Sequence, residues 1–201
     1  MNINGIQLFL QIYYLIFVAV VLVWRIRSVK KKTGINPAVI LRATGVEKIT
    51  SLYIKVTPYV ITGMIIIYSF FDPYYHYLAP IFWLNHGWIQ WGGVGLLLLS
   101  LLVIVLAQHQ MKASFRIGVD KNIKTDLITA GLFSLSRNPI FVGIKLNMIG
   151  FFMVLPNALS LAVCVLEWFF MDIQVVLEEA QMMKNHPDAF SDYCKRVRRW
   201  L

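Results

Sequence analysis

Five long apolar stretches alternate with polar segments along the chain. They lie at residues 6–24, 52–71, 88–107, 139–155 and 158–177. A helix needs about 20 mostly apolar residues to cross a bilayer core, and each stretch comes close to that length. We therefore predict an all-α, polytopic membrane protein with five transmembrane helices, followed by a polar C-terminal segment.

The last two stretches are separated only by a short turn at Pro156 and Asn157. Pro139 opens the fourth stretch, and proline is well tolerated at the first position of a helix because its missing N–H has no intrahelical partner there. We predict that the fourth and fifth helices form a helical hairpin, whose two open ends return to the same face of the membrane.

The basic residues gather on one side of the predicted helices. Of the 19 Lys and Arg residues, only Lys55 and Lys145 fall inside an apolar stretch, and the others would all lie on one side of the membrane. Because cytoplasmic loops are enriched in these two residue types, we predict an outside N-terminus and a cytosolic C-terminal segment.

Composition agrees with a membrane protein and argues against other classes. Hydrophobic residues make up 58% of the chain and charged residues only 14%, against about 25% charged residues in globular proteins. A net charge of +9 fits a nucleic-acid partner. However, the basic residues lie at the ends of the apolar stretches, which indicates that they anchor the helices in a membrane. The four histidines lack the spacing of zinc ligands, so no metal is expected.

Three ionisable residues, Lys145, Glu167 and Asp172, fall inside the last two stretches, where such residues indicate function. Lys145 lies 11 residues before Pro156 and Glu167 lies 11 residues after it, so in a hairpin both are about 16 Å from the turn. We predict that Lys145 and Glu167 approach each other, either as a buried ion pair that joins two helices or as part of a substrate channel.

An acidic stripe runs along the fifth helix, because Glu167, Met171, Gln174 and Glu178 follow one another at steps of three or four residues. The stripe ends in the pair Glu178-Glu179. Acids at the C-terminal end of a helix oppose the helix dipole. We therefore expect a cationic partner for this pair, either the basic C-terminal segment or a sulfonium ligand.

The sequence Ser-Arg-Asn-Pro at residues 136–139 offers the opposite polarity at the start of the fourth helix. Asn138 is a residue type that caps helices, and the free N–H groups of a helix start favour an anion. The planar fork of Arg137 suits a carboxylate. The alternative is an arginine that only reaches from the membrane border toward water.

Small residues mark two further helix faces. The run Gly92-Gly93-Val94-Gly95 follows no strand, so it does not match the dinucleotide fingerprint and is better explained by close helix packing. Gly143, Asn147 and Gly150 share one face of the fourth helix. That face either leaves a gap through which an acceptor enters from the lipid or packs tightly against another helix.

Residues 127–143, with the sequence Leu-Ile-Thr-Ala-Gly-Leu-Phe-Ser-Leu-Ser-Arg-Asn-Pro-Ile-Phe-Val-Gly, resemble a motif of the isoprenylcysteine carboxyl methyltransferase family and its phospholipid methyltransferase relatives. The acid pair Glu178-Glu179, the block Phe-Ser-Asp-Tyr at residues 190–193 and the closing basic run to Arg199 follow in the family's order and spacing. The resemblance covers about residues 107–201. It implies an integral membrane enzyme that binds S-adenosylmethionine at the cytosolic end of its last two spans, under the C-terminal segment.

The resemblance also implies which residues form the site. Cofactor-binding positions would be Gly131, Arg137, Asn138, Pro139, Phe141, Glu178, Glu179 and Tyr193. Arg199 would lie near the acceptor as a catalytic candidate, and Glu178 and Glu167 on the acidic stripe are the candidates for taking up a proton. Relatives usually carry histidine at the position of Asn138 and tyrosine at that of Phe141. Neither replacement titrates, so acid–base chemistry is not expected at these two positions.

We predict one membrane-embedded domain over residues 1–201, with three spans in 1–106 and a cofactor-binding half in 107–201. Segment 114–120 resembles bacterial members, which implies a bacterial inner membrane with the active site on the cytosolic side. The predicted function is S-adenosylmethionine-dependent methyl transfer to a lipophilic acceptor, either a prenylcysteine-like carboxylate or a lipid amine. The alternatives are a small-thiol S-methyltransferase and a membrane protein that binds NADPH as sterol reductases do.

Overall fold

The structure is a computed structural model that describes residues 4–42, 45, 47–119 and 124–201. Regular structure in these residues is helical. The α-helices are α1 (Gly5–Phe17), α2 (Arg25–Thr33), α3 (Glu47–Phe70), α4 (Asp72–Tyr75), α5 (Gly87–Met111), α6 (Pro139–Val154), α7 (Ala158–Asn185) and α8 (Pro187–Arg196). A π-helix, η1 (Val18–Trp24), joins α1 to α2, and short 3-10 helices are η2 (Val39–Arg42), η3 (His76–Leu78), η4 (Phe82–Leu84), η5 (Lys112–Ser114) and η6 (Gly131–Ser134).

Four helical segments within the described residues are long and apolar enough to cross a membrane: Gly5–Thr33, Glu47–Phe70, Gly87–Ser114 and Ala158–Asn185. The all-helical class of the prediction is confirmed. The first segment extends beyond the predicted span because no helix breaker follows Trp24. It stops at Gly34, whose left-handed backbone (φ 71°) is the usual way to end a helix.

The fourth predicted span is shorter than a bilayer core. Helix α6 has 16 residues, which corresponds to about 24 Å at 1.5 Å per residue, whereas the hydrocarbon core is about 30 Å thick. The structure therefore has four helices of spanning length in its described part, and a fifth crossing by α6 stays a prediction. Asn157 caps α7 through a reciprocal pair of hydrogen bonds with Ser160 and so fixes the turn between α6 and α7.

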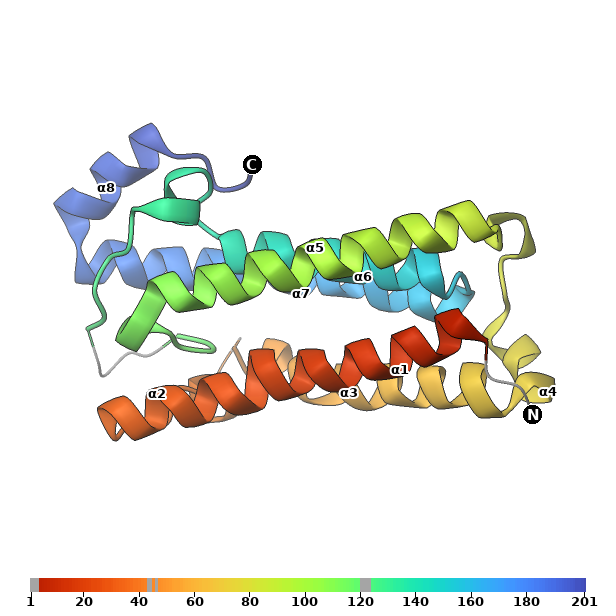
Figure 1. Cartoon of the computed structure of the whole chain (residues 1–201). Coiled ribbons are helices and arrows are strands. Elements are labelled where there is room, and N and C mark those ends of the chain that lie inside the picture. The colour runs from red at the N-terminus through yellow and green to blue at the C-terminus, as the bar shows by residue number, and fades with distance from the viewer. Residues whose placement is uncertain (1–3, 43–44, 46, 120–123) are drawn as a thin grey trace.

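The helices form two groups that run roughly along one axis (Figure 1). Helices α1, α2 and α3 lie in one group, and α5, α6 and α7 lie in the other. The buried core between them includes Leu10, Met64, Leu97, Val154 and Leu155.

Helices α5 and α6 approach each other through their glycines. A Cβ added to Gly150 would lie 2.9 Å from the carbonyl oxygen of Gly93, and one added to Gly143 would lie 2.5 Å from Cγ1 of Ile104. Close packing at Gly93 is thereby confirmed. The alternative of a lateral gap at Gly143, Asn147 and Gly150 is wrong, because α5 fills that face.

Asn147 on the same face belongs to a buried polar cluster. Its side-chain amide donates to the hydroxyl of Tyr13 and, at 3.0 Å, to Oγ of Ser100. The Tyr13 hydroxyl lies 3.0 Å from the carbonyl oxygen of Leu97. Buried polar groups are stable when they bond one another, so this cluster fastens α1 to α5 and α6.

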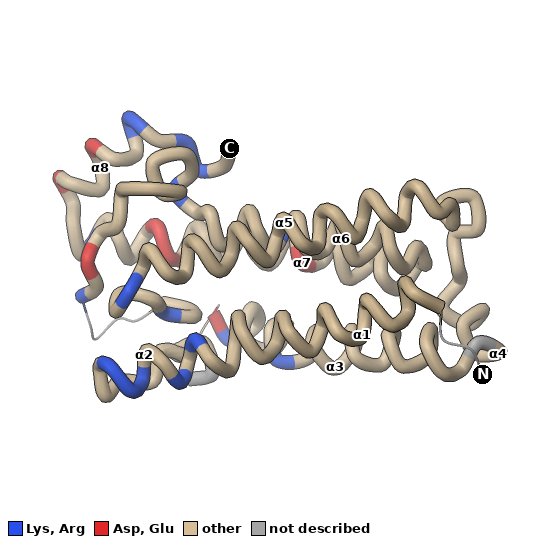
Figure 2. Tube along the Cα trace, in the orientation of Figure 1, with Lys and Arg blue, Asp and Glu red and all other residues tan. Residues whose placement is uncertain are grey.

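Lys and Arg gather at the end of the bundle where α2 and α8 lie (Figure 2). We call this the basic end. The opposite end, near α4, carries exposed aromatic residues, among them Tyr77, Trp83 and Trp88 at 75%, 74% and 76% exposure. Interfacial aromatic residues and clustered cations at the two ends of apolar helices are typical of an integral membrane protein.

Candidate active site

The turn before α6 is fastened to the C-terminal segment at the basic end. The backbone N–H of Arg137 donates to the carbonyl oxygen of Arg198 at 2.9 Å. The hydroxyl of Ser136 donates to the carbonyl oxygen of Arg199 at 3.0 Å and accepts from the backbone N–H of Asn138 at 3.1 Å. Residues 136–138 therefore position the segment beyond α8 beside the start of α6.

Glu179 on α7 is the centre of a cluster of charged residues, which we call the Glu179 junction. Nε of Arg137 lies 3.0 Å from Oε1 of Glu179, and Nη2 of Arg137 lies 3.3 Å from Oε2. Arg199 donates to Oε2 at 2.7 and 3.1 Å, and the amide of Asn138 donates to Oε1 at 3.0 Å. Two arginines and an amide thus compensate a carboxylate whose side chain is 12% exposed.

The junction corrects the expected role of Asn138 as a helix cap. Asn138 occupies the cap position of α6, but its side chain makes no capping hydrogen bond, because its amide is turned toward Glu179. The alternative of an Arg137 that reaches out to water is also wrong, since its side chain is 12% exposed and binds the carboxylate of Glu179. The remaining donors of Arg137 meet the carbonyl oxygens of Cys194 and Val197 at 3.3 and 3.0 Å.

Glu178, the next residue, has different partners. Its Oε1 accepts from the amide of Gln174 at 3.0 Å, and its carboxylate also accepts from the backbone N–H of Gly118. Thr50 on α3 holds the other end of Gln174 by donating to Oε1 at 3.2 Å. Within the described part of the chain no Lys or Arg pairs with Glu178, so the basic segment compensates only one acid of the pair.

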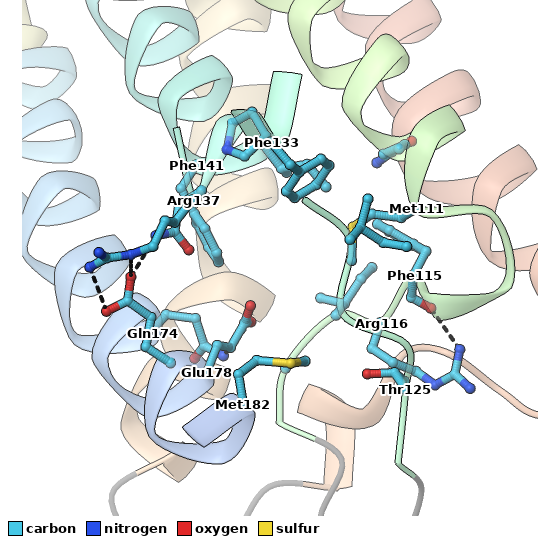
Figure 3. Close-up of a pocket in the computed structure, with 18 of the residues that line it drawn as sticks. Met111, Phe115, Arg116, Thr125, Phe133, Arg137, Phe141, Gln174, Glu178 and Met182 are labelled. Carbon is cyan, nitrogen blue, oxygen red and sulfur yellow. Dashed lines mark hydrogen bonds and ion pairs between the residues drawn. The ribbon is translucent and has the colours of Figure 1, made fainter. Parts of the chain in front are cut away.

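Glu178 faces a cavity of ≈ 230 Å³ between the helix groups at the basic end (Figure 3). A water molecule's share of liquid volume is only about 30 Å³, so the cavity has room for an organic molecule. Its walls are largely apolar and aromatic. The lining includes Met111, Phe115, Phe133, Phe141, Ile144, Met171 and Met182.

The predicted site residues meet at this cavity with two exceptions. Its lining includes Arg137, Asn138, Pro139, Phe141, Glu167, Glu178, Glu179 and Tyr193. Gly131 and Arg199 do not line it. Gly131 has a left-handed backbone (φ 66°), and its missing Cβ leaves room for the side chain of Gln110, which accepts from the N–H of Leu132 at 2.9 Å. Arg199 contacts residues of the site instead: its side chain binds Glu179, and its carbonyl oxygen accepts from the hydroxyl of Ser136.

Tyr193 closes the cavity from α8. Its hydroxyl donates to the carbonyl oxygen of Phe133, and burial raises the pKa of Tyr193 to about 12. The phenol therefore stays protonated at neutral pH and keeps this bond. His186, at the start of α8, holds the facing loop through the carbonyl oxygen of Thr125 at 2.7 Å.

The predicted approach of Lys145 to Glu167 is wrong. Nζ of Lys145 lies 2.6 Å from Oδ1 of Asp172, whereas Glu167 is hydrogen-bonded to Tyr53 and lines the cavity. An equal number of residues from the turn does not fix the direction of the two side chains. Successive residues on a helix point about 100° apart, and Glu167 and Asp172 lie on different faces of α7.

Sequence reasoning missed the contributions from the first half of the chain. The lining of the cavity also includes Val21, Leu22 and Ile54, together with Gln108 of α5. Residues 115–118 and 125–128 also line it. No local signal marks Val21, Leu22 or Ile54, since an apolar residue facing a cavity is of the same type as one facing lipid.

Apolar helices of spanning length, with a cavity lined by carboxylates and aromatic rings at one end, are typical of an integral membrane protein with a ligand-binding site. The profile of the phospholipid methyltransferase family matches residues 88–188, just over half of the chain, and the chain therefore belongs to this family of membrane methyltransferases. The resemblance identified from the sequence is confirmed. A comparison with curated proteins found no match.

Proposed function

We propose that this protein transfers a methyl group from S-adenosylmethionine to a lipid acceptor. The observation that carries the proposal is the pair of adjacent acids in different settings. Two arginines and an amide bind the carboxylate of Glu179, while Glu178 faces the cavity and forms no ion pair with a Lys or Arg of the described residues. A site with an uncompensated carboxylate favours a ligand that brings its own positive charge.

The residues present fit this cofactor. When bound, S-adenosylmethionine supplies an electrophilic methyl group on a positively charged sulfur. Glu178 would attract that positive centre, and the rings of Phe115, Phe133 and Phe141 would cover an adenine and exclude water. NADPH fits less well, because a phosphate group needs cations that can turn toward it. The guanidinium of Arg137 is bound to Glu179, and that of Arg116 donates to the carbonyl oxygens of Ala113 and Phe115.

The chemistry of the lining favours a lipid amine over a prenylcysteine-like carboxylate. Val21, Leu22, Ile54 and Ile144 contribute apolar surface, and the carboxylate of Glu167 lines the same cavity. A carboxylate acceptor beside Glu167 would place two like charges in an apolar setting, which is costly. An amine must lose a proton before it attacks a methyl group, and we assign the uptake of that proton to Glu167.

The position of the basic end indicates which side of the membrane the cavity faces. Cytoplasmic ends of membrane helices are enriched in Lys and Arg, and these residues gather at the end that carries the cavity (Figure 2). We propose a cytosolic active site in a bacterial inner membrane. A water-soluble cofactor would reach it from the cytosol, and a lipid acceptor would reach it from the bilayer.

The test is transfer of a labelled methyl group from S-adenosylmethionine into a total membrane lipid extract and, separately, into small thiols. We expect a labelled lipid amine with the wild-type protein and a loss of about hundredfold with Glu178→Gln, since hydrogen bonds and pairs to charged groups contribute about 1.5–3 kcal/mol. The matched control is Asp192→Asn, which removes an exposed acid that pairs with Lys195. Label in thiols alone would replace the lipid acceptor by a small thiol, and no transfer to either would reject the proposal.

A further inference from the structure

Lys145 lies in an unusual setting for a lysine inside an apolar helix. Its side chain is 9% exposed, and Nζ lies 2.6 Å from Oδ1 of Asp172 on α7. The same ammonium group lies 4.6 Å from the ring centre of Trp168 and 3.6 Å from that of Trp200. Lys145 therefore binds one carboxylate and two aromatic faces.

Two of these three partners explain how α6 is joined to α7, but the third does not. Asp172 and Trp168 are one turn apart on α7, so they already provide a helix-to-helix contact. Trp200 comes from the segment beyond α8, and its ring is the nearer of the two. A cation over an aromatic face is a favourable contact that strengthens when water is excluded. Lys145 thus holds the C-terminal segment as well as α7.

Residues 197–200, which we call the strap, connect Lys145 to the candidate active site. The carbonyl oxygens of Val197, Arg198 and Arg199 accept hydrogen bonds from Arg137 and Ser136 at 2.9–3.0 Å. The side chain of Arg199 binds Glu179 at 2.7 Å. Each residue of the strap therefore contacts either the Glu179 junction or Lys145.

Lys145 and Trp200 do not line the cavity, and the contacts described here connect Trp200 to it through the strap. With Trp200 held, the backbone of the strap stays on Ser136 and Arg137, and Arg199 stays on Glu179. Release of Trp200 would leave the strap fastened at one end, and the cavity wall formed by Arg137, Asn138 and Glu179 would lose one of its supports.

We propose that Lys145 and Trp200 are positioning residues that fasten the strap inside the membrane and thereby set the affinity of the cavity for its methyl donor. The statement about affinity rests on the function proposed above. The statement about fastening does not, because it concerns the position of residues 197–200 alone.

The experiment uses the full chain in detergent or nanodiscs with two readouts. The first is the rate of trypsin cleavage after Arg198 and Arg199, followed by mass spectrometry. The second is KM for S-adenosylmethionine measured separately from kcat. We expect Trp200→Ala and Lys145→Met to speed cleavage and raise KM about tenfold, equivalent to about 1.4 kcal/mol, with kcat changed less than twofold. Lys145→Arg and Trp200→Phe keep a cation and a ring, so both should stay within about threefold of wild type.

Two controls remove residues of the same types elsewhere. Trp83→Ala removes a tryptophan that is 74% exposed at the opposite end of the bundle, and Lys184→Met removes an exposed lysine of α7. Neither should change cleavage or KM. Trp200 is only half-buried and outside the helix core, so Trp200→Ala tests the proposal even when Lys145→Met fails to fold.

Unchanged cleavage in Trp200→Ala would overturn the fastening of the strap. Faster cleavage with an unchanged KM would overturn its control of affinity. Should the wild-type protein bind no S-adenosylmethionine at all, the proposed function and the statement about affinity fail together. The cleavage rates would then still decide whether Lys145 and Trp200 fasten the strap.

Discussion

Glu178 and Glu179 are neighbours in the sequence, yet they belong to two regions with opposite chemistry. The Glu179 junction is a closed set of charges, in which Arg137, Arg199 and Asn138 satisfy one carboxylate. The wall around Glu178 is open, with an amide from Gln174 and a backbone N–H as its donors and a largely apolar cavity in front. Adjacent residues on a helix point about 100° apart, so one acid can build the site while the next is left for a ligand.

This difference separates effects on stability from effects on ligand binding. Removing the charge of Glu179 leaves Arg137 and Arg199 without their carboxylate partner and should weaken the fold. Glu178 has no Lys or Arg partner among the described residues, so no cation loses its partner when its charge is removed. The fold should therefore stay unchanged, and the binding of a cationic ligand should weaken.

The largest expected effect on the fold is that of Glu179→Gln. Breaking a buried ion pair costs about 3–5 kcal/mol because the partner charge stays buried, and here the side chains of Arg137 and Glu179 are both 12% exposed. We expect a loss of about 3 kcal/mol in thermal unfolding in detergent. Glu178→Gln is the matched control and should unfold as the wild type does. Equal destabilisation by the two variants would remove the distinction between the regions.

Glu167→Gln should slow methyl transfer without weakening cofactor binding. A positioned general base contributes about 10²–10⁴-fold, and we expect a fall in kcat of at least about hundredfold with an amine acceptor. The Kd for S-adenosylmethionine should change less than twofold, since Glu167 lies 11 residues before Glu178 on α7, which is about 16 Å along the helix axis. Steady-state kinetics measures kcat, and calorimetry measures the Kd. A kcat equal to that of the wild type would rule out Glu167 as the proton acceptor.

Asn138→Ala should have a smaller effect on the junction. It removes a hydrogen bond to Oε1 of Glu179 while both arginines stay in place, and a bond to a charged group contributes about 1.5 kcal/mol at the low end of its range. Thermal unfolding should therefore shift by about half of the change in Glu179→Gln. A shift as large as that of Glu179→Gln would mean that the amide, rather than Arg137, holds the carboxylate.

Arg199→Gln should have the smallest effect on stability. Its side chain is 43% exposed, and ion pairs at the surface contribute about 0.2–1 kcal/mol. We expect about 0.5 kcal/mol in thermal unfolding, with Lys195→Gln, which breaks an exposed pair within α8, as the matched control. A loss above about 2 kcal/mol would show that Arg199 shares the buried part of the junction with Arg137.

The sequence was sufficient to predict features that depend on composition and spacing. Apolar stretches located the long helices. The resemblance to the methyltransferase family, rather than spacing, implied that Arg137, Glu178 and Tyr193 meet at one place, and all three line the cavity. Helical spacing also predicted that Glu167 and Glu178 would share a face, and both line the cavity.

Features that depend on packing could not be predicted in the same way. The choice of Asp172 over Glu167 as the partner of Lys145 depends on how α6 and α7 are rotated about their axes. The turn of Asn138 toward Glu179 depends on a residue of α7 that becomes a neighbour only in the folded protein. Contributions of Val21 and Ile54 to the cavity arise from the docking of the two helix groups, for which an apolar sequence carries no specific signal.

The central claim is that Glu178 is free for the positive centre of a methyl donor. Calorimetry with S-adenosylmethionine, which is positively charged at sulfur, and with S-adenosylhomocysteine, which is not, tests it directly in the wild type and in Glu178→Gln. We predict that Glu178→Gln weakens the binding of S-adenosylmethionine at least about tenfold more than that of S-adenosylhomocysteine. Equal weakening of both ligands, or binding of neither by the wild type, would contradict the claim.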